Sequence, residues 1–379
     1  MKTPTLGRLN MKFLKLALLG TAALAAASVS ARADSLDSLK AAMDSLNISA
    51  AADAPAAAAP STSVVWTGYV RAGVTTSYNG AGVYATDIRS YGEIKVTAKT
   101  ETAVGEVGVA YQIQNNNTQT AAVNTAGEVG INGNGSNGAI STDDISGWWK
   151  MTPNMTLSGG FIGTLAKSSY SWDAVATNWW SASTGGGVYG GIPNGDPAQV
   201  QLAYADGPLS FAVAVEDSNN DLTVNASASA VGVTGKLGYK MDAFGVDLQG
   251  GYWGDAVGGL SPAYSITAGA GYSAGAFSVG VAAGIDQPLF QPVAFTQTLG
   301  SAYAKLNLSD VAHLEIGATH DFGTSALDAS SGQTTVGGGI YYTPVKQLAF
   351  GVEAGYGTGN SLGTVGGNYT ASLISQFMF

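Results

Sequence analysis

The chain has 379 residues, of which 45% are hydrophobic and only 11% are charged, and its formal net charge is −10. It contains no cysteine, which excludes disulfide bonds and thiolate metal sites. Residues 1–33 hold five of the 16 basic residues and no acidic one, so the remainder has eleven basic against 26 acidic residues, a net charge of −15. A protein this acidic has no electrostatic basis for binding nucleic acid.

Residues 1–33 have the pattern of an export signal. Lys2, Arg8, Lys12 and Lys15 precede an apolar run, and small residues surround a cleavage point at residues 31–33. The run is too short for a retained transmembrane helix, so we expect a signal peptide, with an N-terminal anchor helix as the alternative.

Two short segments follow the signal. In residues 34–49, Leu36, Leu39, Met43 and Leu46 recur at steps of three and four, which predicts one apolar helical stripe. The stripe fits either a small parallel coiled coil that joins protomers on the periplasmic side or a frayed amphipathic helix. Residues 50–63 are rich in Ala and Pro and form an expected linker.

From residue 64 to residue 379 the apolar residues alternate with polar ones. The end of the chain, YTASLISQFMF, has Tyr369, Leu373 and Phe377 in one phase and Thr370 and Gln376 in the other. This period of two residues predicts strands with one apolar and one polar face. The fold class is therefore all-β.

About sixteen such segments are separated alternately by tight turns and by longer polar loops, which favours an antiparallel transmembrane β-barrel. The expected turns lie at residues 102–105, 152–154, 206–208, 241–244, 273–276, 309–311 and 343–346. The expected loops lie at residues 79–86, 115–141, 166–197, 217–221, 254–262, 286–295, 322–333 and 357–368. Sixteen and eighteen strands both remain possible, because residues 222–240 fit one long strand or two short ones.

Three features favour lipid as the partner of the apolar face. Aromatic residues of the apolar phase, such as Trp66, Tyr78, Tyr264 and Tyr272, gather at segment ends, where the two girdles of a membrane barrel lie. Charged residues are confined to the opposite phase within segments, which is expected when that phase faces a water-filled interior. Only a closed sheet satisfies every backbone group in a bilayer.

The opening residues 68–74 (GYVRAGV), the alternation that follows and the terminal Phe379 resemble the outer-membrane porins of alphaproteobacteria, and more loosely the general porins of other Gram-negative bacteria. The resemblance covers residues 64–379. It implies a sixteen-stranded homotrimeric barrel in the outer membrane, in contact with lipid and lipopolysaccharide. It also implies passive diffusion of ions and small hydrophilic solutes, and a third outer loop that folds inward to narrow the pore.

The longest expected connection, residues 166–197, is the candidate for that constriction. Its aromatic residues Trp172, Trp179, Trp180 and Tyr189 are too many for a loop in open solvent. Packed on the inner wall, they would narrow the channel; a loop that caps the mouth or contacts a neighbouring protomer is the alternative. Asp173 and Asp196 are its only acidic residues.

Several charged residues fall on inward phases and are candidate pore-lining residues. Pairing of the first two strands places Arg71 near the level of Glu93 and Lys95, and a basic wall facing an acidic loop would set a transverse field across the pore. Cross-strand ion pairs that only stabilise the barrel are the alternative, which we prefer for Lys305 opposite Glu315. The candidates are Arg71, Arg89, Glu93, Lys95, Lys99, Asp173, Asp196, Lys236 and Lys240.

The acidic outer loops and the net charge of −15 predict a mild preference for cations. We expect no cofactor and no resident metal, although Asp143 and Asp144 could bind Ca²⁺ weakly. The chain has two histidines, His313 and His320, in opposite phases of one segment, so they cannot share a ligand. An outer-membrane lipase or protease built on His320, and a surface adhesin, are the alternative functions.

Overall fold

A computed structural model describes residues 61–78, 84–123, 129–132, 140–172, 197–217, 231–254, 262–287, 296–323, 332–358 and 368–379. The chain divides into two units, Met1–Ala59 and Pro60–Phe379. The expected signal peptide, the helix at residues 34–49 and most of the linker lie outside the described residues. Among those that are described, no helix is both long and apolar enough to cross a membrane.

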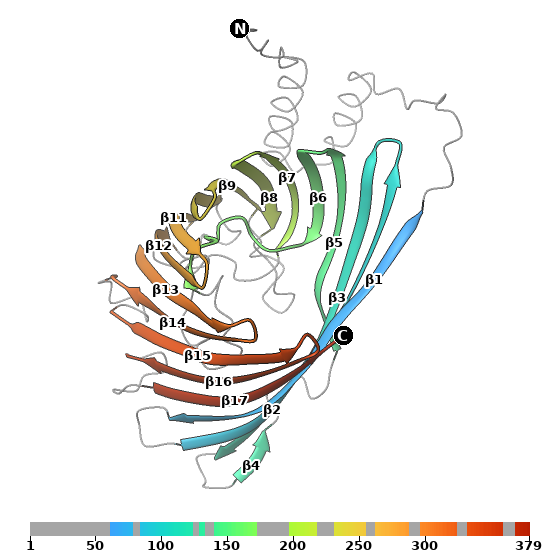
Figure 1. The fold of residues 1–379 in the computed structure, drawn as a ribbon. Helices are drawn as coiled ribbons and strands as arrows, with labels where there is room; N and C mark the ends of the chain where they lie inside the picture. The colour runs from blue at the N-terminus through green and yellow to red at the C-terminus, as the bar shows by residue number, and fades with distance from the viewer. Residues whose placement is uncertain are drawn as a thin grey trace. The chain divides into compact units, whose positions relative to one another are not determined.

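The second unit is an all-β structure whose strands are antiparallel and close into a ring (Figure 1). Each strand pairs with the next in the chain, except that β3 pairs with both β4 and β5, and β17 returns to pair with β1. Sixteen strands therefore form the closed barrel, and the four-residue β4 lies beside it. The strands are β1 (Thr62–Tyr78), β2 (Tyr84–Thr102), β3 (Gly105–Val123), β4 (Val129–Asn132), β5 (Ile140–Thr152), β6 (Met155–Phe161), β7 (Ala198–Asp206), β8 (Leu209–Asp217), β9 (Val231–Met241), β10 (Phe244–Trp253), β11 (Ala263–Ala274), β12 (Phe277–Gln287), β13 (Gln297–Ser309), β14 (Ala312–Asp321), β15 (Thr334–Val345), β16 (Leu348–Gly357) and β17 (Asn368–Met378).

The alternation in the sequence becomes the two faces of this barrel. On β17, Leu373 is 62% exposed on the outer face while its neighbours Ser372 and Ile374 are buried on the inner face. On β14, Ile316 is exposed outward and Glu315 is buried inward. Because side chains alternate between the faces of a strand, one register around the ring puts the apolar phase outside and the charged phase inside.

The turns agree closely with the expected ones. Two-residue turns join β2 to β3, β5 to β6 and the later pairs at one end of the barrel, and the strand ends that the longer connections join are at the other end. Three details differ from the sequence-based expectation. The last turn lies at residues 346–347, β3 continues to Val123 and pairs with β4 inside the expected 115–141 loop, and the long connection after β6 begins at residue 162 rather than 166.

The ring closes where β17 meets β1. Their register runs from Tyr69 opposite Met378 to Tyr78 opposite Tyr369. At the long-loop end, the rings of Tyr78 and Tyr369 lie 5.7 Å apart, and Tyr84 and Tyr356 extend this row onto β2 and β16. At the other end, Phe379 exchanges backbone hydrogen bonds with Gly68. Both ends of the seam are therefore held by aromatic residues.

Candidate pore-lining site

The chain that follows β6 runs along the inner wall of the barrel instead of continuing outward. Figure 1 shows this green segment crossing inside the ring toward β11. Within residues 162–172, Thr164 contacts β8, Ser168 contacts β10 and Trp172 contacts β13. The described start of the expected constriction loop is thus an inward-folded segment, here called the inner segment (residues 162–172). Residues 173–196, which include Asp173 and Asp196, lie outside the described part.

Asp247 of β10 is the central anchor of the inner segment. Its Oδ1 accepts a hydrogen bond from the Ser168 hydroxyl at 2.8 Å, and its Oδ2 accepts one from the Ser169 backbone N–H at 2.6 Å. Lys236 of β9 lies 3.6 Å from the same Oδ2 and donates to the Lys167 carbonyl oxygen at 2.9 Å. A buried carboxylate that accepts hydrogen bonds from a hydroxyl and a backbone amide, with an ammonium beside it as counter-charge, holds a chain segment firmly.

A second carboxylate, Glu216 of β8, holds the beginning of the segment. It is 1% exposed, and it accepts hydrogen bonds from the hydroxyls of Thr164 at 3.0 Å and Thr234 at 3.1 Å. Two carboxylates on neighbouring parts of the wall therefore fix residues 164–169, so this part of the segment is attached to the wall at two points.

The aromatic residues of the inner segment pack on glycines of the wall. The Tyr170 ring lies against Gly245 and Gly271, where a Cβ atom would collide with it, and Trp172 lies in the same way on Gly317. The Trp172 backbone N–H also donates to the Ser301 hydroxyl at 2.9 Å. Burial, and secondarily the Asp247 carboxylate, raises the pKa of Tyr170 above its ordinary value. Because these wall positions are glycines and have no side chain, the two rings can lie flat against the wall.

Across the ring, Arg71 stands in a cluster of polar and aromatic side chains. It lies opposite Tyr91, and Glu93 lies opposite Tyr69, so the four side chains form a two-by-two patch on β1 and β2. The Arg71 guanidinium lies 4.9 Å from the centre of the Tyr69 ring, and its Nε donates to Gln376 of β17 at 3.0 Å. Arg71 and Glu93 are therefore close, as expected from the hairpin. They lie on neighbouring strands and are displaced along them by one inward-facing position.

The other expected basic residues have mixed surroundings. Lys95 forms an ion pair with Asp144 at 3.1 Å, and Lys99 forms one with Glu106 at 3.2 Å. Lys240 is exposed on the inward phase beside the turn at residues 242–243. The side chain of Arg89 lies outside the described part of the chain, so its role stays a prediction. Lys305 lies opposite Glu315, as the symmetric hairpin predicts.

Sequence reasoning missed the acidic half of the inner wall. It placed the acidic partners of the basic wall on the loop, whereas buried carboxylates gather on the strands from β8 to β16. These residues are Glu216, Asp247, Asp286, Glu315, Asp321 and Glu353. Each belongs to an inward phase that can be read from the sequence, but the contacts of Glu216 and Asp247 with the inner segment cannot. Tyr69 and Tyr91 were also missed as site residues, although the hairpin register of β1 and β2 places them opposite Glu93 and Arg71.

The geometry does not favour an enzyme built on His320. This residue is on the outward phase, where its Nδ1 lies 2.7 Å from the Thr334 hydroxyl and its ring packs edge-on against Phe322. Asp321 is on the opposite face of the strand, so it cannot orient the ring as the acid of a triad does. His313 faces inward and stacks on Tyr341, which confirms that the two histidines are on opposite faces.

The expected weak Ca²⁺ site at Asp143 and Asp144 stays a prediction. The Asp144 carboxylate is engaged by Lys95, and the side chain of Asp143 is outside the described residues. Over the described ranges, no group of three or more His, Cys, Asp or Glu side chains is arranged to hold a metal ion.

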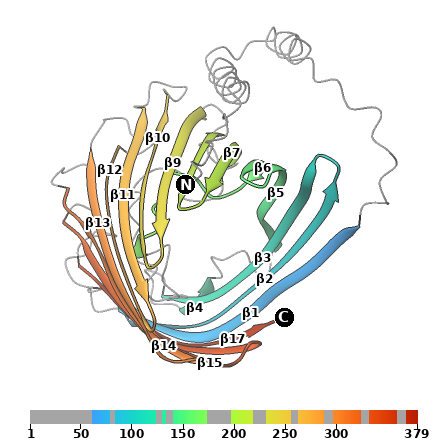
Figure 2. The ribbon, with the colours of Figure 1, turned by 45° about the horizontal axis from the view of Figure 1, so that its top comes forward.

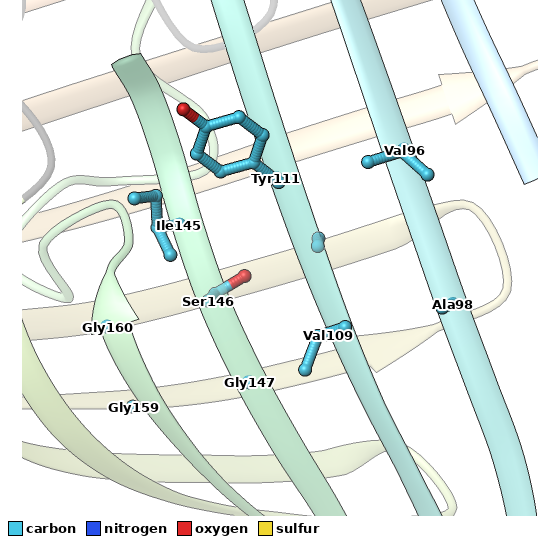
Figure 3. Close-up of a pocket in the computed structure, with 10 residues that line it drawn as sticks. Val96, Ala98, Val109, Tyr111, Ile145, Ser146, Gly147, Gly159 and Gly160 are labelled. Atoms are coloured by element: carbon cyan, nitrogen blue, oxygen red, sulfur yellow. The ribbon is translucent and has the colours of Figure 1, made fainter.

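The outer wall has a shallow hollow of about 350 Å³ on β2, β3, β5 and β6. Figure 3 shows Val109, Tyr111 and Ile145 around it, with Gly147 and Gly159 in its floor. Its lining is almost wholly apolar and has no converging set of catalytic groups, so it does not resemble an active site.

Comparisons with solved structures agree on the fold. The structure is similar to the anion-selective porin from Comamonas acidovorans, with a TM-score of 0.65 and 12% sequence identity over 84% of this chain and 100% of that one. It is also similar to Salmonella typhi OmpF in a complex with daunomycin, with a TM-score of 0.64 and 14% identity over 83% of this chain and 97% of that one. A mutant of the Rh. blastica porin gives a TM-score of 0.56 and 16% identity over 84% of this chain and 100% of that one.

No protein-family model matches the chain, and the curated proteins compared with it show no match in sequence. At identities of this size the likeness concerns the fold: the chain is a closed sixteen-stranded barrel of the kind found in bacterial outer-membrane porins.

Proposed function

We propose that this protein is a porin, a water-filled channel for the passive diffusion of ions and small hydrophilic solutes across the outer membrane of a Gram-negative bacterium. The observation that carries the proposal is the contrast between the two faces of the closed barrel. The outer face presents large apolar side chains such as Leu373 and Ile316, and the inner face carries charge. An apolar exterior fits hydrocarbon, and a charged interior requires water.

In this proposal the connection at residues 162–197 narrows the channel. The inner segment supports this role, because it is bound to the wall by Asp247 and Glu216. The space left for solutes would then lie between this segment and the wall formed by β1, β2 and β3.

The channel is expected to prefer cations mildly. The net charge of −15 and the acidic strands β8 to β16 favour entry of cations, whereas the basic residues Arg71 and Lys95 lie on the facing wall. The resulting transverse field would orient polar solutes in the passage.

The remaining parts of the proposal concern export and assembly. Residues 1–33 would be removed after export, and the barrel would assemble as a homotrimer that contacts lipid and lipopolysaccharide, as the resemblance to porins implies. Residues 34–49 would then lie on the periplasmic side. Chemical cross-linking of the protein in its native membrane should yield a ladder that ends at three chains.

Reconstitution of the purified protein in planar lipid bilayers tests the channel. We expect stepwise increases of current in KCl, and reversal potentials of cationic sign in a salt gradient. A protein that inserts into liposomes and gives no current would contradict the channel and would favour an adhesin. Phospholipase activity that is lost in His320→Ala would favour the barrel enzyme.

Arg71 provides a test of the transverse field. Arg71→Gln should raise the cation-to-anion permeability ratio by about twofold, because a positive charge leaves the passage while Glu93 remains. Lys346→Gln removes the same charge from the turn at residues 346–347 and should leave the ratio unchanged. Equal ratios in wild type and Arg71→Gln would show that Arg71 does not act on permeating ions.

A further inference from the structure

The patch around Arg71 combines aromatic rings with hydrogen-bonding groups of both kinds. The Tyr69 and Tyr91 rings lie 5.7 Å apart with 29° between their planes. The Tyr69 hydroxyl donates to Glu93 Oε2 at 3.0 Å, and the Tyr91 hydroxyl donates to the side-chain amide oxygen Oε1 of Gln114. The rings are partly exposed on the inner face, so a solute that enters the barrel can reach them.

Charges in and beside this patch compensate one another. Arg71 lies diagonally across from Glu93, and the neighbouring Lys95 forms an ion pair with Asp144 at 3.1 Å. Arg71 thus has the carboxylates of Glu93 and Glu353 near it, and Lys95 has that of Asp144, so each basic group of the patch already has an opposite charge within the wall. This balance favours a neutral ligand over an anion or a cation.

Two polar atoms of the patch have no partner among the described residues. Glu93 uses Oε2 to accept from the Tyr69 hydroxyl, which leaves Oε1 as an acceptor. Gln376 uses Oε1 to accept from Arg71, which leaves its Nε2 as a donor. A ligand with hydroxyl groups can both donate to Glu93 and accept from Gln376, and its C–H faces can pack on the tyrosine rings.

The patch lies where a solute would have to pass. In the ring order, β1 and β2 are eight strands from β10 and β11, to which the inner segment is bound. Figure 2 shows β1, β2 and β3 across the ring from β9, β10 and β11. The side chains around Arg71 therefore face the side of the lumen that carries the inner segment.

We propose that Tyr69, Tyr91, Glu93 and Gln376 form a binding site for a neutral polyhydroxylated solute, a small saccharide, on the inner wall of β1, β2 and β17. The inference rests on the proposed channel and names a class of solute for it. Amphipathic rings supply most of the contact area, and Glu93 and Gln376 fix the orientation of the sugar hydroxyls.

The test uses the full-length exported protein in planar bilayers, with maltotriose added to one side. We expect concentration-dependent interruptions of the open-channel current. Half-maximal interruption should need about tenfold more maltotriose in Tyr91→Ala, since one aromatic contact is lost. Tyr91→Phe keeps the ring and should stay within about twofold of wild type. Tyr303→Ala removes an inward tyrosine on the distant strand β13 and serves as the matched control.

The outcomes separate the site from the channel. Open channels that maltotriose does not interrupt, or interruptions of equal strength in wild type and Tyr91→Ala, would overturn the site and leave the channel intact. Interruption by citrate or spermine at equal concentration, without an effect of maltotriose, would show a charge-driven site and would also overturn it. If no current flows at all, the channel fails, and calorimetric titration of the detergent-solubilised protein with maltotriose decides the site.

Discussion

Asp247→Asn should loosen the inner segment and raise both the conductance and the current noise of the open channel. The amide can keep its oxygen toward the Ser169 backbone N–H and the Lys236 ammonium, and its N–H₂ group then replaces the oxygen that accepts from the Ser168 hydroxyl. The substitution therefore removes one acceptor and the negative charge, so the bond from Ser169 is no longer charge-assisted and Lys236 loses its counter-charge. The expected cost is about 1–3 kcal/mol of local stability. Single-channel recording measures the conductance, and hydrogen exchange measures the protection of residues 163–172.

Asp242→Asn is the matched control for this substitution. Asp242 is in the turn between β9 and β10 with a φ of 49°, a conformation that asparagine also tolerates, and its side chain does not reach the inner segment. Conductance and exchange should match wild type. If Asp247→Asn also matched wild type in both measurements, the wall carboxylate would not be what holds the segment.

Gly68→Ala should weaken the closure of the ring. A Cβ at this position would lie 2.5 Å from the Glu93 carbonyl oxygen and 2.6 Å from the Phe379 ring, so the strand pairing and the terminal ring both have to shift. Overpacking of this kind costs about 1–3 kcal/mol, and here it acts where the first and last strands meet. The unfolding temperature of the barrel in detergent should fall. The change in electrophoretic mobility between the folded and the unfolded barrel measures it.

The neighbouring strand provides the control for that experiment. At Gly92 a Cβ would meet nothing closer than the Tyr69 carbonyl oxygen at 3.7 Å, so Gly92→Ala should leave the unfolding temperature unchanged. The double variant Gly68→Ala with Phe379→Ala should recover part of the loss, because one of the two collisions is removed. Full stability of Gly68→Ala alone would contradict the role given to this contact.

The sequence determined which residues face which side. Alternation with a period of two residues follows directly from strand geometry, so Leu373 and Ile316 could be assigned to the outer face, and Glu315 and Lys305 to the inner face, without any coordinates. Turn signals at positions such as Gly275 fixed the hairpins, and hairpins pair neighbouring residues in register. This local rule also predicted that Lys305 lies opposite Glu315 and that His313 and His320 cannot act together.

Only the tertiary structure decided which inward residues meet. Thr164 and Glu216, or Ser168 and Asp247, are separated by 52 and 79 residues, and no local period relates their positions. Their contact depends on the path of a connection that has no repeating pattern and on the closure that brings β17 next to β1. Alternation assigns a side chain to a face, but the distance between two residues on that face depends on the curvature and register of the whole ring. For this reason the hold of the acidic wall on the inner segment, and the contact of Arg71 with Gln376 across the closure, emerged only from the folded barrel.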